Sequence, residues 1–433
     1  EIIVLGGTWS SFPMEYRKNF INEVYYGVNT FYDDKKTPRE MLSLAEEQEI
    51  NTSSSGKVRI VGLTVETRPD CITPDEIESM LEFGVTRVQL GIQHTDNRIL
   101  KKINRKCTIE EAKAGIKMLK DSGFKIICHY MPNLPDTTPD LDRKMLTQAL
   151  EDPDLDCDDF KIYPTMVTTT SERDRDNVFS VLEKWYLDGK YVPYSETDLH
   201  EVLVEFMSNP LLRSKRISRL FRDIPKHNTI AGCETPHMRE VIMKDLNSRG
   251  LKCECIRSRE VRKAVFNPDE NEVIVHHREC SEGDEYFIEL VNNDFILGFV
   301  RLRLPQGDFT QKYSAMPEYA FIRELHVYSH VNSTMTDIEN EESKQHRGYG
   351  TMLLQRAEAI CQQKGFYAIA IIAGVGVRDY YANKHGYKLE KNYMVKHTKV
   401  YSSMEKFDAI LTTARICEMF YYIITSLFKW VTN

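Results

Sequence analysis

The residues with the clearest chemistry lie late in the chain, between a predicted strand and a predicted helix. Residues 322–327 alternate in polarity as a strand does, and residues 351–360 carry apolar side chains at helical spacing. Between them, Gln345-His346-Arg347-Gly348-Tyr349-Gly350 forms a Gln-x-x-Gly-x-Gly turn. Glycines admit a ligand close to the backbone, and N–H groups at a helix N-terminus bind anions, most often phosphate. The turn matches neither the dinucleotide fingerprint nor the Walker loop, so it predicts another phosphate-bearing ligand.

A second segment follows that could act on the same ligand. Residues 368–372 form an apolar run typical of a strand, followed by Gly374, Gly376, Tyr380 and Tyr381, and then by Gly386-Tyr387. A phenol placed near a leaving group can act as a general acid. The alternative is that both tyrosines are ordinary core aromatics, which is the commoner role.

The two segments together resemble the GNAT acetyltransferases, and the resemblance implies an acetyl-CoA site. In that family acetyl-CoA lies along the strand, where backbone groups of Leu325 and Val327 would bond the pantetheine as an added strand does. Glu324 and His326 share the opposite face and would orient a water or the thioester, although a satisfied core histidine is an equal alternative. Tyr381, with Tyr380 beside it, would lie on the sulfur side. The pyrophosphate would be held at Gln345, Gly348, Tyr349, Gly350, Thr351 and Met352.

Composition indicates a globular protein of two or three domains. The 433 residues are 41% hydrophobic and 28% charged, and the net charge of -8 excludes wholesale coating of nucleic acid without excluding a local basic groove. Ten scattered cysteines and the lack of a signal peptide favour a reducing, intracellular setting, cytoplasmic with the nucleus as the alternative. The chain opens on Glu1 and a buried-strand run, which we interpret as the start of a fragment.

Residues 1–165 repeat one theme, a short apolar strand followed by a loop and an amphipathic helix. Strands are predicted over residues 2–5, 58–63, 88–92, 125–129 and 160–163, and helices over 14–28, 74–83, 108–122 and 140–151. Alternating strands and helices predict a parallel sheet with its active-site groups at the strand C-termini. The fold class is therefore α/β, with an open, partial TIM barrel.

The predicted strand ends carry a series of polar motifs in a fixed order. They are Gly6-Gly7-Thr8, the Thr-Val-Glu-Thr-Arg-Pro-Asp of residues 64–70, the Gln-Leu-Gly-Ile-Gln-His of 89–94, the Pro-Asn-Leu-Pro-Asp of 132–136 and the Lys-Ile-Tyr-Pro-Thr of 161–165. The series, placed before a GNAT segment, resembles the catalytic subunit of Elongator, a radical-SAM barrel fused to a GNAT domain. That resemblance covers residues 1 to about 396.

The resemblance implies cofactors, partners and site residues. S-Adenosylmethionine (SAM) would lie near Gly6, Gly7, Glu66, Arg68 and Gln93, although Glu66 and Arg68 could instead form a structural ion pair. RNA would approach Lys161 and Tyr163. The partners would be tRNA and other Elongator subunits, with a homodimer as an alternative.

The cluster cysteines of that family are absent from the expected place. Its three-cysteine motif, which holds a [4Fe–4S] cluster, lies upstream of the first predicted strand, so we expect the cluster only in a longer parent protein and predict no metal site here. Cys71, Cys107, Cys128 and Cys157 do not reproduce the motif spacing and are interpreted as small buried side chains or bystanders. The Cys253-Glu254-Cys255 pair lacks the second pair that zinc usually needs.

Four regions are expected: the partial barrel (1–165), a connecting region (166–265), the GNAT domain (266–396) and a C-terminal extension (397–433). In the connecting region, residues 211–222 carry bases that alternate with apolar residues, and we predict that Arg216, Arg219 and Arg222 contact RNA phosphates. A solvated face is the alternative. Residues 404–430 predict an amphipathic helix that docks on the body or on a partner, with a membrane anchor as the second choice because Arg415 and Glu418 interrupt the run.

Three functions compete at this point. The first, implied by the resemblance, is a tRNA-modifying acyltransferase that uses acetyl-CoA and SAM to place a carboxymethyl group on the wobble uridine. The second is a protein lysine (histone) acetyltransferase with the barrel as a scaffold. The third is a non-catalytic tRNA-binding remnant, favoured by the missing cluster cysteines.

Overall fold

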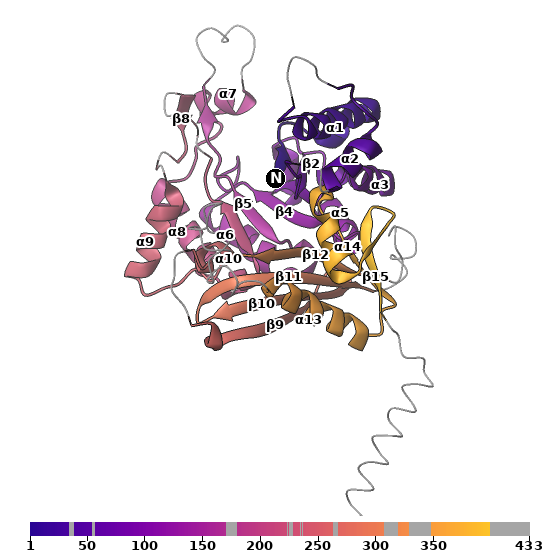
Figure 1. Ribbon diagram of the computed structural model, residues 1–433. Coiled ribbons are helices and arrows are strands. Elements are labelled where there is room, and N and C mark those ends of the chain that lie inside the picture. The colour runs from indigo at the N-terminus through magenta and orange to yellow at the C-terminus, as the bar shows by residue number, and fades with distance from the viewer. Residues whose placement is uncertain are drawn as a thin grey trace, which may run out of the picture.

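The computed structural model describes residues 1–33, 39–53, 57–169, 180–222, 224, 228–233, 235, 237–262, 267–306, 319–328 and 348–398. These residues form an open half-barrel followed by a second, mixed sheet, with the connecting region beside them (Figure 1). Gln345 and residues 399–433 lie outside the described residues, so the predictions made for Gln345 and for the helix at 404–430 stay predictions. No described helix is long and apolar enough to cross a membrane.

The half-barrel is a six-stranded parallel sheet in the order β1-β2-β3-β4-β5-β7. This confirms the predicted parallel α/β architecture. The strands are β1 (Ile2–Val4), β2 (Leu63–Thr67), β3 (Arg87–Gln93), β4 (Lys125–Tyr130), β5 (Asp159–Ile162) and β7 (Arg216–Arg219).

One predicted strand was wrong. The run at residues 58–63 is mostly loop, and β2 begins at Leu63 and continues through Glu66. Val58, Ile60 and Val61 have the apolar character of a buried strand, but this segment contacts the second domain. The carbonyl oxygen of Ile60 accepts a hydrogen bond from Gly376 N–H. Glu66 consequently lies within a strand and not in the loop after it.

The helices of the first domain pack on the outer face of this sheet (Figure 1). Several begin at threonine N-caps, and Thr108 with Glu111 forms a capping box that satisfies two backbone donors. The predicted helices are confirmed to within one residue at each end. The helices are α1 (Met14–Asn29), α2 (Leu44–Thr52), α3 (Pro74–Glu82), α4 (Asn97–Lys102), α5 (Ile109–Asp121) and α6 (Pro139–Glu151).

The connecting region supplies the last strand of the half-barrel, β7, and a helical layer beside it. A two-stranded sheet joins β6 to β8. Its elements are β6 (Val167–Thr168), α7 (Val181–Leu187), α8 (Glu196–Met207), β8 (Thr229–Ala231), α9 (Met238–Ser248) and α10 (Ile256–Arg259).

The second domain is a seven-stranded sheet in the order β14-β15-β13-β12-β11-β10-β9, with α13 packed on the face away from the half-barrel (Figure 1). β9, β10 and β11 form the predicted antiparallel meander, and β12 pairs parallel to β13. The elements are β9 (Asn271–Glu279), β10 (Gly283–Asn292), β11 (Phe295–Pro305), β12 (Tyr319–Val327), α13 (Tyr349–Gln363), β13 (Ala368–Ile371), α14 (Arg378–His385), β14 (Lys388–Glu390) and β15 (Tyr393–His397).

Buried ion pairs join the two domains. Arg323 of β12 donates to both carboxylate oxygens of Asp158 at 2.6 and 2.8 Å and to Glu285 at 2.6 Å, and its side chain is almost fully buried. Lys125 of β4 bonds Glu324 of β12 at 2.7 Å. Because buried charges are tolerated only when they are paired, these contacts hold β12 in one position against the base of the half-barrel.

Candidate active site

A cavity of about 880 Å³ runs through the half-barrel and reaches the second domain. Successive residues of a strand point to opposite faces, and on these strands the inward-facing residues are mainly polar and do not fill the lumen with apolar side chains. The lining residues from the strands are Ile3, Thr64, Glu66, Arg87, Gln89, Gln93, Lys125, Ile127, His129, Asp159, Lys161, Arg216, Ser218 and Arg219.

The floor of this cavity belongs to the second domain. Phe299 and Arg301 of β11, Glu324 and His326 of β12, and Tyr328 line its lower end. On β3 the lining runs from Arg87 to Gln93, and the six steps between these two residues span about 20 Å at the rise of a strand. The lumen thus connects the C-terminal ends of the barrel strands with the inner face of β12.

The middle of the lumen holds a hydrogen-bonded polar set. The Oε1 atom of Gln89 accepts from Lys161 Nζ at 2.5 Å and lies 2.9 Å from His129 Nε2. His129 Nδ1 lies 3.8 Å from Glu66 Oε1, and the His129 ring meets Tyr163 edge to face at 5.5 Å.

Burial shifts the titration of this set. Burial, with help from Lys161 and Arg105, lowers the pKa of His129 to about 3, so the ring is neutral at physiological pH. Burial also lowers the pKa of Lys161 and raises the pKa of Glu66. Such opposed shifts on facing groups are typical of sites that bind or transfer protons.

The mouth of the lumen offers a cradle of the kind SAM would need. Gly6 and Gly7 adopt φ of +102° and +66°, and a Cβ at either position would meet nothing within 4 Å, so a ligand can lie against their backbone. Gln93 has φ +73°, and its Oε1 atom is buried without a hydrogen-bond partner. Arg68 differs from the prediction, because it pairs with Asp70 at 2.6 Å and is not among the residues lining the cavity. Gly6, Gly7, Gln93 and Glu66 therefore fit the group, and Arg68 serves a local ion pair.

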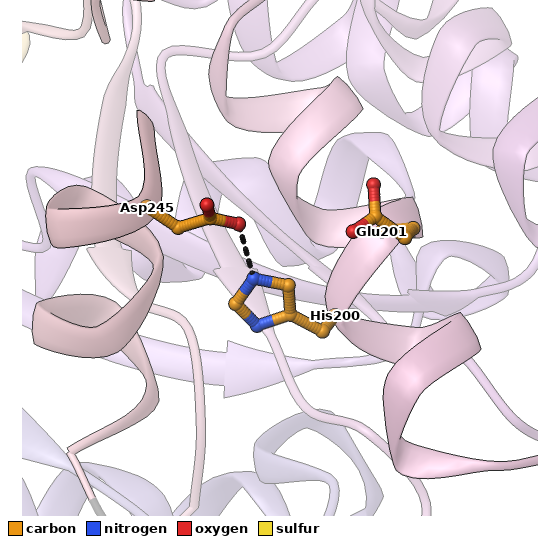
Figure 2. A group of neighbouring side chains, drawn as sticks. All are labelled: His200, Glu201 and Asp245. Atoms are coloured by element: carbon orange, nitrogen blue, oxygen red, sulfur yellow. Dashed lines mark hydrogen bonds and ion pairs between the residues drawn. The ribbon is translucent and has the colours of Figure 1, made fainter. Parts of the chain in front are cut away.

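An iron–sulfur cluster does not fit the part of the chain that the structure describes. No cysteine lines the cavity there. Within the described ranges, the one cluster of potential metal ligands is His200, Glu201 and Asp245, which contains no cysteine. Figure 2 shows His200 pointing at Asp245, 2.7 Å away, and Arg249 bonds both carboxylates at 2.6 and 2.7 Å. Arg249 thus takes the place a cation would occupy, and the cluster joins α8 to α9.

The strand arrangement of the second domain leaves part of one strand edge open to an extended ligand. β13 pairs with β12 only from Tyr319 to Ile322, whereas β12 continues to Val327. An extra residue in β12, Arg323, forms a bulge against Arg301 and Leu302 of β11. Beyond this bulge the edge of β12 that faced β13 has no strand partner among the described residues, so its backbone groups can bond a ligand as an added strand would.

The predicted phosphate turn lies beside the end of this strand edge, since a Cβ on Gly350 would be 3.7 Å from Val327 Cγ2. Gly348 is the N-cap of α13 with φ +151°, and no side chain caps the helix. Intrahelical bonding begins with Met352 N–H on Gly348 O at 2.8 Å, which leaves the earlier N–H groups directed outward. The side chains play different parts, since Tyr349 is buried and accepts from Asn271 at 2.9 Å. Tyr349 can therefore contribute only its backbone.

The two candidate tyrosines of α14 occupy different environments. The Tyr380 hydroxyl lies 3.1 Å from the position of a Cβ on Gly350, bonds the Thr351 side chain, and remains 36% exposed. Tyr381 is 8% exposed and packs in the core of the second domain against Tyr387. Burial raises the pKa of both phenols. The geometry favours Tyr380 at the phosphate turn, while the prediction for Tyr381 stays a prediction.

Glu324 and His326 share one face of β12, as predicted, but that face is the floor of the lumen. Although burial alone would raise it, Lys125 and Arg301 hold the pKa of Glu324 at about 2. Glu324 is committed to these ion pairs at 2.7 and 3.1 Å, so it is not available to orient a water. His326 stacks on Phe299 at 5.8 Å, and burial lowers its pKa, so a neutral imidazole faces the cavity.

The predicted RNA residues all line the lumen, but Arg216 has a structural partner. Arg216 bonds Glu260 and lies 3.2 Å from the Tyr328 hydroxyl, so it links β7 to the second domain. Because Arg216 also lines the cavity, its contact with an RNA phosphate stays a prediction. Arg219 and Arg222 are both exposed, and together with Lys161 and Tyr163 they line the lumen near its mouth.

Comparison with known proteins gives one consistent result. The Radical SAM superfamily model matches residues 14–146, the Radical_SAM C-terminal domain model matches 157–248, and the GNAT acetyltransferase model matches 255–387. Over 92% of the chain, it is 35% identical to the "tRNA uridine(34) acetyltransferase" of Methanocaldococcus infernus and 31% identical to "Elongator complex protein 3" of Saccharomyces cerevisiae, covering 71% and 68% of those proteins. The chain belongs to the Elongator protein 3 family.

A solved structure supports the same assignment. The archaeal Methanocaldococcus infernus Elongator protein 3 with an N-terminal deletion is 34% identical, and the alignment covers 92% of this chain and 89% of that one with a TM-score of 0.79. The domain pair of this family implies SAM, a [4Fe–4S] cluster and acetyl-CoA. The four-region division predicted from the sequence stays a prediction, although the three matches fall within similar limits.

The sequence analysis assigned no role to some residues of this Elongator protein 3 site. Gln89 was part of the motif at residues 89–94 but only Gln93 was selected from it, and His129 and Arg301 lie in strands outside the motifs. One signal was present: polar residues occupy positions that share one face of each strand, at 87, 89 and 93 on β3 and at 125 and 129 on β4, with Gly91 and Ile127 at the positions between them. Period-two polarity on strands of a parallel barrel indicates a wet lumen and not a packed core.

Proposed function

We propose that the chain is a tRNA uridine(34) acetyltransferase that uses acetyl-CoA in its GNAT half and receives the anticodon nucleotide in its barrel half. One observation carries the proposal: a single cavity is lined by the barrel strands and by β11 and β12 of the GNAT sheet. A thioester bound along β12 would present its acyl group to the same chamber that opens at the C-terminal ends of the barrel strands.

The acetyl-CoA half would work through backbone groups. The free edge of β12 beyond Arg323 bonds the pantetheine, and the N-terminus of α13 at Gly348 and Gly350 bonds the pyrophosphate. The Tyr380 hydroxyl, which bonds the Thr351 side chain, would donate a hydrogen bond to the pyrophosphate or to the sulfur of the bound acetyl-CoA. His326, neutral and buried at the chamber floor, orients the acyl group or an attacking water.

The barrel half would bind RNA. Arg219 and Arg222 at the mouth contact phosphates, and the polar lumen below them receives the nucleotide. SAM, when bound against Gly6, Gly7 and Gln93, supplies radical chemistry. The described residues hold no cluster ligands, so we derive no step that passes through the cluster. Assembly with other Elongator subunits, the activity's usual setting by resemblance, is part of the proposal.

The test is CoA release from acetyl-CoA by the purified chain, with and without a tRNA that carries U34. We expect release to rise at least tenfold with tRNA. The variant Gly348→Val should abolish it, since φ of +151° is strained for any residue with a Cβ and the side chain would cover the turn. Gly27→Ala, where a Cβ meets nothing within 4 Å, is the control. Release that is driven equally by lysine peptides without RNA would instead support a protein acetyltransferase, and no release in any mixture would support an RNA-binding remnant.

A further inference from the structure

Gln89 is the least exposed polar residue of the lumen, and its amide orientation is determined by its neighbours. The side chain lies in the middle of β3, is 1% exposed, and lines the cavity. Its Oε1 atom accepts from Lys161 Nζ at 2.5 Å and faces His129 Nε2 at 2.9 Å. A lysine ammonium can only donate, so the atom facing it must be the amide oxygen.

The consequence is that Gln89 presents its NH₂ group to the lumen. No acceptor among the described residues bonds Gln89 Nε2, although an amide nitrogen can donate twice. A nearly buried donor without a protein partner lowers the stability of the fold unless a ligand or a water molecule accepts its hydrogen bond. The geometry therefore leaves one half of this side chain available to an occupant of the cavity.

The same contacts determine the tautomer of His129. Its Nε2 atom faces the Gln89 oxygen and so carries the proton, which makes Nδ1 an acceptor. The middle of the lumen thus displays an amide donor from Gln89, ammonium donors from Lys161 and an imidazole acceptor from His129, whose Nδ1 atom lies 3.8 Å from Glu66 Oε1. The rings of Tyr163 and His129 are perpendicular with their centroids 5.5 Å apart, and Tyr163 lines the same cavity.

We propose that Gln89, His129 and Lys161 read the base of the nucleotide that enters the lumen and select uracil over cytosine. This inference rests on the proposed function and names the specificity element of that site. The edge of uracil offers an acceptor, a donor and an acceptor, at O4, N3–H and O2. The lumen offers donors on Gln89 and Lys161 and an acceptor on His129, which complements that pattern. Cytosine would direct its N4 amino group at a donor and its N3 acceptor at the imidazole acceptor.

Lumen size and charge agree with a single flipped nucleotide. The cavity of about 880 Å³ is lined at its mouth by Arg219 and Arg222, which suit the phosphates on either side of an extruded base. Tyr163 lines the same cavity and contacts His129, and an aromatic ring in such a cavity can stack on a base.

The experiment compares two anticodon stem-loops that differ only at position 34, carrying U or C, by equilibrium binding to the full chain. It needs neither acetyl-CoA nor a loaded radical-SAM centre. We expect the wild type to bind the U34 stem-loop about tenfold more tightly than the C34 stem-loop, which is the discrimination typical of one well-formed base contact. Gln89→Leu should reduce the ratio to near one while affinity for the C34 stem-loop changes less than threefold.

A second variant gives the proposal a directional test. Gln89→Glu keeps the shape but replaces the amide donor by an acceptor, which accepts well from the amino group of cytosine, so the preference should move towards C34. Gln363→Leu, the same change at an exposed position near the end of α13, should leave the ratio unchanged.

The outcomes separate this inference from the proposed function. Equal wild-type affinity for U34 and C34, or an equal loss of both in the Gln89 variants, would overturn base selection even if tRNA stimulates CoA release. Failure of the wild type to bind either stem-loop and to release CoA with tRNA would overturn the proposed function itself.

Discussion

The assignment of the phenol beside acetyl-CoA can be decided by two matched substitutions. Tyr380 and Tyr381 are adjacent, yet the Tyr380 hydroxyl lies over the turn that begins α13 and Tyr381 packs in the core. We predict that Tyr380→Phe lowers kcat/KM for acetyl-CoA in the tRNA-stimulated assay about tenfold. Tyr381→Phe should change it less than twofold.

The magnitude follows from the contact. A hydrogen bond to a charged group contributes about 1.5–3 kcal/mol. The Tyr380 hydroxyl already bonds Thr351 in the free protein, so replacing that bond by one to the ligand should contribute a free energy near the lower end of this range. About 1.4 kcal/mol corresponds to tenfold. The assay is CoA release at varied acetyl-CoA, with anticodon stem-loop affinity as the control. A larger loss for Tyr381→Phe than for Tyr380→Phe would refute the geometric reasoning and restore the assignment made from the sequence.

Three further predictions concern charges. Arg323→Met should lower the free energy of unfolding by about 3–5 kcal/mol in a denaturant titration, because it removes the partner of the buried Asp158 carboxylate. An effect below 1 kcal/mol would contradict this prediction. Although burial opposes them, Arg323 and Arg301 lower the pKa of Asp158 in the folded protein. The resulting stabilisation is therefore present above the unfolded pKa of about 3.9 and is lost as the pH falls below that value. Acid unfolding of Arg323→Met, monitored by circular dichroism, should accordingly begin at a higher pH than in the wild type. Arg219→Ala should weaken tRNA binding and reduce the slope of log affinity against log salt by about 1, whereas Arg216→Ala should mainly reduce stability; an unchanged slope for Arg219→Ala would remove it from the RNA surface.

Sequence reasoning located the architecture because the local patterns and the global fold agree. Apolar strands alternate with capped helices through residues 1–165, and the Gly-x-Gly turn of α13 matches its helix. The pattern misplaced β2 because residues 59–61 lie against Gly374 and Gly376 of the second domain and do not belong to a strand. Contacts between residues three hundred positions apart leave no periodic signal in either segment.

The candidate site was predictable where it rests on backbone and not where it rests on side-chain partners. Gly6, Gly7 and the turn at Gly348 were found because positive φ and helix termini restrict residue type. The ion pairs of Glu324 and Arg216 could not be predicted because their partners lie far away in the sequence, at Lys125 and Glu260 respectively. A charged residue in a sequence does not reveal whether it faces a ligand or a counter-ion.

Residues 59–62 of the half-barrel and residues 374–376 of the second domain form a close contact between the two halves. Val375 is fully buried in the core of the half-barrel, and Gly376 N–H bonds Ile60 O at 2.9 Å. A Cβ on Gly376 would lie 2.6 Å from Arg59 Cβ and 2.8 Å from Ile60 N, which neither backbone nor stem can accommodate without shifting. The segment runs directly into α14, which carries Tyr380, and its partner runs directly into β2, which carries Glu66.

We therefore predict that Gly376→Ala lowers the free energy of unfolding by about 1–3 kcal/mol, the usual cost of overpacking. It should also reduce the tRNA stimulation of CoA release, because the phosphate turn and the lumen wall are positioned through the same contact. Gly27→Ala, in an open helical position, is the matched control and should be neutral or stabilising by about 0.5–1 kcal/mol. Denaturant titration measures the first effect and the CoA assay the second. If stability falls while the ratio of CoA release with and without tRNA stays at the wild-type value, the junction supports folding alone, and communication between the halves must pass through the floor formed by β11 and β12.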